Sequence, residues 1–187
     1  MNLVDMVESQ IIASVTNDQD LKQAINSSAN IIFLLTGNIM TVAEHIRKIK
    51  QANKYVFVHL DFIDGISSSK TALTFVAEQW KPTGIITTKS HIVKLAKEVG
   101  LMAIQRIFLL DRNAVIKGIE MVNSCHPDAV EVMPGIMPKV IDQLSTNLVF
   151  PIIAGGLIDN ISEVHQALEN GALAVSTGIP ELWNFDL

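Results

Sequence analysis

The sequence predicts a small single-domain (β/α)8 barrel of the TIM type that occupies residues 1–187 and has a shortened last helix. Three observations predict this fold. Short apolar runs alternate with longer amphipathic stretches, which is typical of a parallel sheet covered by helices. The alternation repeats eight times, at about 23 residues per unit, so the barrel should be minimal. The chain has a one-domain length and about half of its residues are apolar, which is ample for one core.

The eight expected strands are short apolar runs, each followed by a polar loop. They span Ile11–Val15, Ile31–Leu35, Tyr55–Leu60, Gly84–Thr87, Leu101–Ile107, Ala129–Val132, Pro151–Ala154 and Ala172–Ser176. Helical patterns lie between them at Asp18–Ser27, Ile39–Ala52, Ser68–Gln79, Ser90–Val99, Asn113–Asn123, Met137–Leu144 and Ile161–Asn170. The last helix is expected to be very short, at Ile179–Trp183, or missing. An open flavodoxin-like sheet is the alternative fold, but it would need fewer strands.

Composition restricts the function further. The net charge of −5 does not indicate a dedicated nucleic-acid protein, although a local basic patch would still allow binding. The single cysteine, Cys125, excludes an intramolecular disulfide and argues against a cysteine zinc site. No apolar run approaches the roughly 20 residues that span a bilayer, and no metal or dinucleotide motif is present. We therefore expect a cytoplasmic protein with no membrane partner, no metal and no cofactor.

Polar residues gather at the carboxyl ends of the expected strands, where (β/α) barrels carry their sites. They are His59, Asp61, Thr87, Lys89, Gln105, Arg106, Glu131, Gly155, Gly156, Ser176 and Thr177. Because side chains alternate along a strand, His59 and Asp61 should share a face and both point into the barrel mouth. Glu131 should also turn inward, between two valines that face the helices.

Gln105 and Arg106 are neighbours, so at most one of them can point inward. We expect Gln105 at the mouth and Arg106 at the rim. Lys89 opens the expected fourth helix, where it could neutralise a phosphate, form a Schiff base or be solvated.

Two pairs of residues predict a phosphate site. Gly155 and Gly156 follow the seventh strand, and Ser176 and Thr177 end the eighth. In barrels of this class the loops after these two strands hold phosphate groups, with help from a helix N-terminus. Glycines let backbone N–H groups approach an anion closely, and the hydroxyls add donors. The alternative is that the glycines form only a tight turn and the hydroxyls only cap a helix.

Six stretches, spread in order over almost the whole chain, resemble one protein family. They are Val58–Gly65, Gly84–Lys89, Gln105–Phe108, Pro127–Gly135, Pro151–Ile158 and Gly171–Thr177. Together they resemble the glycerol uptake operon antiterminator regulatory proteins, the GlpP family. The resemblance implies a regulator that binds glycerol 3-phosphate, acts on the leader mRNA of glycerol-use genes and allows transcription past a terminator.

The resemblance also implies roles for the residues of the rim. The phosphate would lie on Gly155, Gly156, Ser176 and Thr177. The glycerol hydroxyls would meet the polar residues across the mouth, namely His59, Asp61 and Glu131, with Lys89 and Gln105. An enzyme that acts on a small phosphorylated polyol or sugar, either an aldolase or an isomerase, is the alternative function.

Two basic clusters are candidates for RNA binding, although runs of this kind are commonly solvated helix faces. The candidates are Arg47, Lys48, Lys50 and Lys54 around the second expected helix, and Lys94 and Lys97 on the fourth. A homodimer would enlarge such a surface, and we keep it as a possible assembly.

Overall fold

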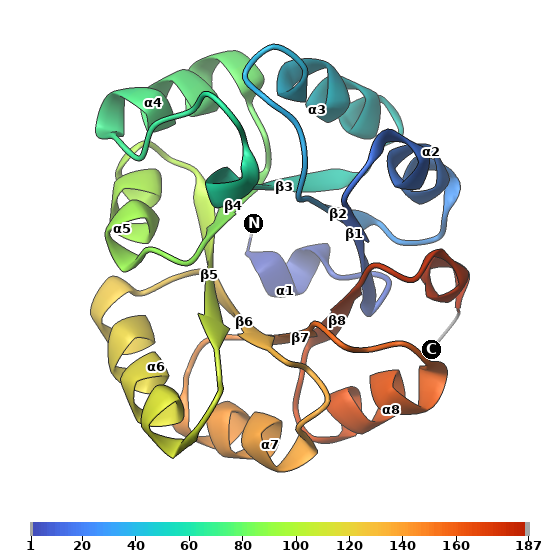
Figure 1. Ribbon diagram of the computed structural model, residues 1–187, viewed down its shortest axis with the longest axis vertical. Coiled ribbons are helices and arrows are strands. Elements are labelled where there is room, and N and C mark those ends of the chain that lie inside the picture. Colours follow the sequence, from blue (N-terminus) through green and yellow to red (C-terminus); the bar gives the residue numbers. More distant parts are fainter. Residues whose placement is uncertain (1, 186–187) are drawn as a thin grey trace.

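The computed structural model describes residues 2–185. Its eight strands are all parallel and close into a barrel in the order β1 to β8 (Figure 1). The strands are β1 Ile11–Val15, β2 Ile31–Leu34, β3 Tyr55–His59, β4 Gly84–Thr87, β5 Met102–Phe108, β6 Ala129–Met133, β7 Ile152–Gly155 and β8 Ala174–Thr177. The expected barrel is confirmed, and the open sheet is excluded because β8 pairs with β1.

Helices surround the strands on the outside (Figure 1). They are α2 Asp18–Asn26, α3 Val42–Gln51, α4 Lys70–Phe75, α5 Ser90–Glu98, α6 Arg112–Cys125, α7 Pro138–Asn147 and α8 Ile161–Glu169. Three shorter turns complete the ring: η1 Leu60–Phe62, the π-helical turn η2 Val76–Trp80 and η3 Pro180–Asn184. The shortened last helix is therefore confirmed as the 3-10 turn η3. No helix within residues 2–185 has the length and apolar character needed to cross a membrane.

One further helix, α1 Leu3–Met6, was not expected from the sequence. Leu3 and Met6 are buried against the apolar side chains that fill the barrel. The Asn30 side chain donates a hydrogen bond of 2.6 Å to the Met6 carbonyl oxygen and fixes the end of the helix. Figure 1 shows α1 across the far end of the barrel, where it closes the amino-terminal opening. A four-residue helix has too few residues to show a periodic pattern in the sequence.

The barrel interior changes from apolar to polar between two layers of side chains. The inner apolar layer includes Phe57 on β3, Ile104 on β5, Ala129 on β6 and Ala174 on β8. Two residues further along each strand, the same inward face carries buried polar side chains. They are His59, Arg106, Glu131 and Ser176. The fold therefore closes one end of the barrel with α1 and leaves a polar layer at the other.

Candidate functional site

A buried ionic network lies at the centre of the polar layer. The Arg106 Nε atom donates to Glu131 Oε2 over 2.6 Å, and the Ser176 hydroxyl donates to Glu131 Oε1 over the same distance. Glu131 is fully buried and Arg106 is 4% exposed. A buried carboxylate is costly unless it is paired and hydrogen-bonded, and here both of its oxygens have donors. This network joins β5, β6 and β8 across the mouth.

Three buried nitrogens beside this network have no hydrogen-bond partner among residues 2–185. They are Nδ1 and Nε2 of His59 and Nη2 of Arg106. Buried polar groups are satisfied in the great majority of native structures, so an unsatisfied group needs an explanation. A bound polar ligand would supply it, because hydroxyl or phosphate oxygens can accept from the guanidinium and exchange hydrogen bonds with the imidazole.

The environment of His59 keeps its imidazole neutral. Burial, followed by the nearby positive charge of Arg106, lowers the pKa of His59 to about 4, against the opposing effect of Asp61. The Phe62 ring stacks on the imidazole with 4.2 Å between ring centroids. A neutral imidazole offers one donor and one acceptor, which suits a ligand hydroxyl.

Asp61 lies beside His59, with 3.9 Å between Asp61 Oδ2 and His59 Nδ1, but its carboxylate turns toward the loop after β4. The strand ends at His59, and Asp61 lies in the turn η1. Its carboxylate accepts hydrogen bonds from the Thr87 hydroxyl and the Thr88 backbone N–H, and it pairs with the Lys89 ammonium at 3.1 Å. Burial acts to raise the pKa of Asp61, but the hydrogen bonds from Thr88, Lys89 and Thr87 together outweigh it and lower that pKa.

Asp61 and Lys89 therefore bind each other and connect the loops that follow β3 and β4. The Lys89 ammonium also contacts the Ser68 hydroxyl at 3.1 Å, and its side chain is 46% exposed. These contacts hold the rim in shape, and they use two of the three N–H donors of the half-exposed Lys89 ammonium.

The expected orientations of Gln105 and Arg106 are wrong, and the two are reversed. Gln105 is buried on the outer face of β5, where its amide donates to the carbonyl oxygens of Thr87 and Arg106. The thiol of Cys125 on α6 contacts the amide oxygen of Gln105 at 3.7 Å. The strand register determines which of the two points inward. Arg106 is aligned with Glu131 in the β5–β6 ladder and shares its inward face.

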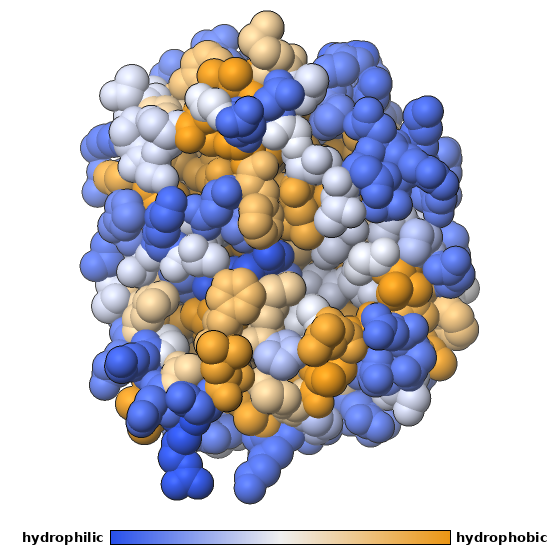
Figure 2. Space-filling view, in the orientation of Figure 1, coloured by the Kyte–Doolittle hydropathy of each residue, from blue (hydrophilic) through white to orange (hydrophobic). Residues whose placement is uncertain are grey.

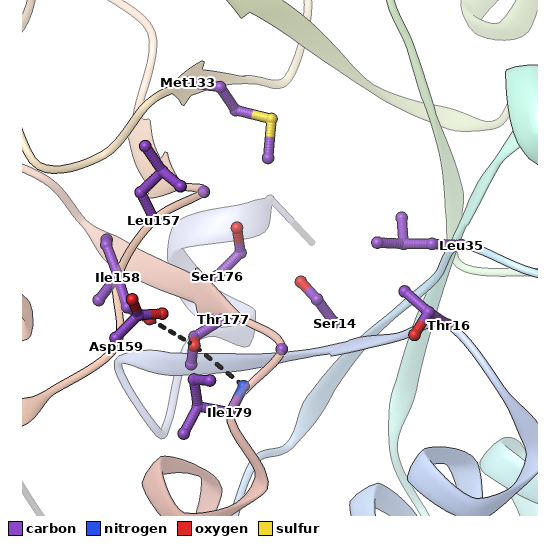
Figure 3. Close-up of a pocket in the computed structure, with 12 residues that line it drawn as sticks. Ser14, Thr16, Leu35, Met133, Leu157, Ile158, Asp159, Ser176, Thr177 and Ile179 are labelled. Atoms are coloured by element: carbon purple, nitrogen blue, oxygen red, sulfur yellow. Dashed lines mark hydrogen bonds between the residues drawn. The ribbon is translucent and has the colours of Figure 1, made fainter.

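Three of the four expected phosphate residues, Gly156, Ser176 and Thr177, line a cavity of about 290 Å³ beside the network (Figure 3). Gly156 has a φ of 75°, and a Cβ on Gly155 would lie 2.7 Å from a Glu131 carboxylate oxygen. The close approach of Glu131 therefore requires glycine at Gly155, and the backbone conformation favours glycine at Gly156. Ser176 belongs both to this cavity and to the ionic network.

Thr177 is placed differently from the expectation that its hydroxyl faces a phosphate. The hydroxyl donates to the Ile158 carbonyl oxygen and accepts from the Ile179 backbone N–H. These two bonds join the loop after β7 to the turn after β8, as the dashed lines in Figure 3 show. For this side chain the alternative of a structural cap is the correct interpretation.

The opposite wall of the cavity contains residues that the sequence did not single out. Ser14 and Thr16 come from β1 and the loop after it, and Leu35 follows β2. Figure 3 shows them facing Met133 and Leu157 across the cavity. Strand parity could have identified Ser14, because Ile12 points into the barrel and Ser14 lies two residues beyond it.

The six candidate RNA-binding residues do not form one surface. α3 and α5 lie on opposite sides of α4 in the ring (Figure 1). Lys54 is part-buried and donates to the carbonyl oxygens of Ser27 and Ala29, and burial lowers its pKa. Lys97 donates to the His126 carbonyl oxygen. These two lysines hold the backbone in place, and a role for them in RNA binding stays a prediction.

The remaining four candidates are on helix surfaces. Arg47 and Lys48 both pair with Glu44, at 2.7 Å from Arg47 Nε and 3.7 Å from Lys48 Nζ, and each is about half exposed. Lys50 donates to the Lys81 carbonyl oxygen at the end of η2, and Lys94 lies on α5.

The fold and this site define a class: a minimal (β/α)8 barrel with a buried, partly unsatisfied polar layer at its carboxyl-terminal mouth. Residues 11–183 match the model of the glycerol-3-phosphate responsive antiterminator family, so the chain belongs to that family.

Proteins with known structures and a curated relative resemble this chain closely. A glycerol uptake operon antiterminator regulatory protein from Listeria monocytogenes is 30% identical, with a TM-score of 0.91 and 98% of both chains covered. A glycerol uptake operon antiterminator-related protein from Thermotoga maritima is 33% identical, with a TM-score of 0.82, 92% of this chain and 96% of that chain covered. The protein YgcP of Escherichia coli is 34% identical over 94% of this chain and 92% of its own length.

Barrel enzymes share the fold alone. Orotidine 5′-phosphate decarboxylase from Pyrococcus horikoshii is 17% identical, with a TM-score of 0.68, 89% of this chain and 88% of that chain covered.

Proposed function

We propose that this protein binds glycerol 3-phosphate in the mouth of the barrel and, in its liganded form, acts in the cytoplasm on the leader mRNA of glycerol-use genes so that transcription passes a terminator. The phosphate would occupy the cavity bordered by Gly156 and Ser176. The glycerol hydroxyls would meet His59 and Arg106. No cofactor takes part in this proposal.

The observation that carries the proposal is the set of unsatisfied nitrogens on His59 and Arg106. They lie beside the Arg106–Glu131–Ser176 network, and Ser176 continues that network into the glycine-bordered cavity. A ligand with hydroxyls at one end and a phosphate at the other fits this sequence of groups. Binding would satisfy buried donors that otherwise cost free energy.

The placement of the polar residues favours a sensor over an enzyme. Lys89, the candidate Schiff-base former, is bonded to Asp61 and Ser68 at the rim. Glu131, the candidate general base, already accepts from Arg106 and Ser176. A catalytic group must be within hydrogen-bond reach of the reacting atoms and free to exchange a proton. In this structure both groups are already bonded to protein partners, which favours a sensor.

Calorimetric titration tests the ligand. We expect glycerol 3-phosphate to bind and to be recovered unchanged, while glycerol and inorganic phosphate alone bind far more weakly. Gly156→Asp places a carboxylate at the cavity, and Gly156→Asn is its matched control, with the same shape and the same positive φ but no charge. We expect the aspartate variant to bind at least tenfold more weakly than the asparagine variant. Equal affinities of the two variants would show that the phosphate does not bind in this cavity. Chemical conversion of glycerol 3-phosphate would show that the protein is an enzyme.

A transcription assay tests the regulatory half. A template carrying the leader of a glycerol-use gene is transcribed with purified polymerase, with and without the protein and glycerol 3-phosphate. We expect read-through to rise only when both are present. If read-through does not change when the protein and glycerol 3-phosphate are added, the regulatory proposal is wrong, even if the titration shows binding.

A further inference from the structure

A groove of about 700 Å³ lies on the outside of the barrel between α3 and η2. It is separate from the cavity at the mouth and shares none of its lining residues. One wall is the exposed side of α3, and the other is the end of η2 with Lys81, whose backbone takes the left-handed conformation. Hydrophilic residues gather over α3, at the upper right of Figure 2.

The groove carries positive charge on an otherwise acidic protein. Arg47, Lys50 and Lys81 line it, and Glu44 is the one carboxylate among the described residues that do. Glu44 is already shared by Arg47 and by Lys48, which lies next to the groove. Exposed ion pairs of this kind contribute little to stability, so an incoming phosphate can compete for these cations.

The rest of the lining suits the bases of a nucleic acid. The amide side chains of Gln51 and Gln79 can donate to and accept from base edges. Trp80 forms part of the lining, and the Phe75 ring packs edge-on against it with 5.6 Å between centroids. Phe75 is 40% exposed. Phe75 is not among the lining residues, so Gln51 and Gln79 are the groups of the groove that are placed to contact bases.

We propose that this groove is the RNA-binding surface, where Arg47, Lys50 and Lys81 contact phosphates and Gln51 and Gln79 contact unpaired bases. The inference rests on the proposed function, to which it adds the binding face. The second basic cluster, Lys94 and Lys97 on α5, lies on the other side of α4 in the ring (Figure 1), so Lys94 serves as a comparison in the test.

A short path joins the groove to the mouth. Met40 lines the groove and follows a loop that pairs with the segment after η1. The Ile39 N–H donates to the Asp64 carbonyl oxygen, and the Asp64 N–H donates to the Gly37 carbonyl oxygen. Two residues before Asp64, Phe62 stacks on His59. A ligand that contacts His59 would shift η1, and the pairing of Asn38 with Asp64 would pass this shift to the loop at the groove. Because coupling between two sites is reciprocal, RNA in the groove would change the affinity for the ligand in the same way.

The test measures binding of a fluorescein-labelled leader-RNA hairpin with an unpaired loop, in the presence of glycerol 3-phosphate and over a salt series. Arg47→Gln, Lys50→Gln and Lys81→Gln are compared with Lys94→Gln and Lys139→Gln, which remove exposed cations elsewhere. Each lost phosphate contact should lower the salt slope by about 0.7 and the affinity about fivefold at 0.1 M salt. Glycerol 3-phosphate titrations of every variant verify that the barrel is intact.

Loss of binding confined to the three groove variants would support the proposal. It is overturned if these variants bind like the unmodified protein, or if the Lys94 and Lys139 variants weaken binding equally. If the groove binds an acidic peptide but no RNA, the proposal is overturned and the groove is a site for a protein partner. If the unmodified protein binds no RNA, the proposed function itself fails, which is distinct from RNA binding at another face.

Discussion

Replacing Glu131 by glutamine tests the ionic network on which the site depends. The substitution keeps the size of the side chain but leaves the guanidinium of Arg106, which is only 4% exposed, without its counter-charge. The new amide group also places donors opposite either Arg106 Nε or the Ser176 hydroxyl, both of which now donate to the carboxylate. Breaking a buried pair by removing one partner costs about 3–5 kcal/mol. For a chain of this size, that corresponds to a fall in Tm of roughly 10 °C.

The assay is urea and thermal unfolding followed by circular dichroism, without ligand. The control is the double substitution Arg106→Met with Glu131→Gln, which removes both charges and should recover much of the loss, because an apolar replacement of a buried pair is often neutral. Neither variant should bind glycerol 3-phosphate tightly. A loss below about 1 kcal/mol for Glu131→Gln, or a double variant less stable than the single one, would refute a buried pair at this position.

Two further predictions concern stability. Because the folded pKa of His59, about 4, lies below its ordinary value of 6.5, the folded protein excludes a proton that the unfolded chain binds. The stability is therefore complete above pH 6.5 and falls by up to about 3 kcal/mol toward pH 4, and His59→Gln should remove this part of the slope in urea unfolding over a pH series. Leu3→Ala should cost about 2 kcal/mol, since Leu3 is 1% exposed against the barrel core, whereas Val4→Ala, at a position 51% exposed, should change the unfolding midpoint little. An equal effect of the two substitutions would contradict the role of α1 as a plug.

The sequence by itself determined the barrel and the location of its functional end. Alternating apolar runs and amphipathic stretches impose a parallel sheet covered by helices, and parity along a strand turns His59 and Glu131 inward. The paired glycines at 155 and 156 were identifiable because they follow the seventh strand, where barrels of this class bind phosphate. These features depend on local chain geometry, which a sequence records directly.

The tertiary structure alone decided which polar groups face the mouth. Arg106 rather than Gln105 points inward because the register against β6 sets it opposite Glu131, which lies 25 residues away. Asp61 and Thr177 turn to partners on neighbouring loops, and Lys54 is bound to backbone carbonyl oxygens of a segment 25 to 27 residues earlier. The hydrogen-bond partners of a long polar side chain depend on which groups the tertiary structure places near it. That information exists only once the strands are in register and the loops have closed over them.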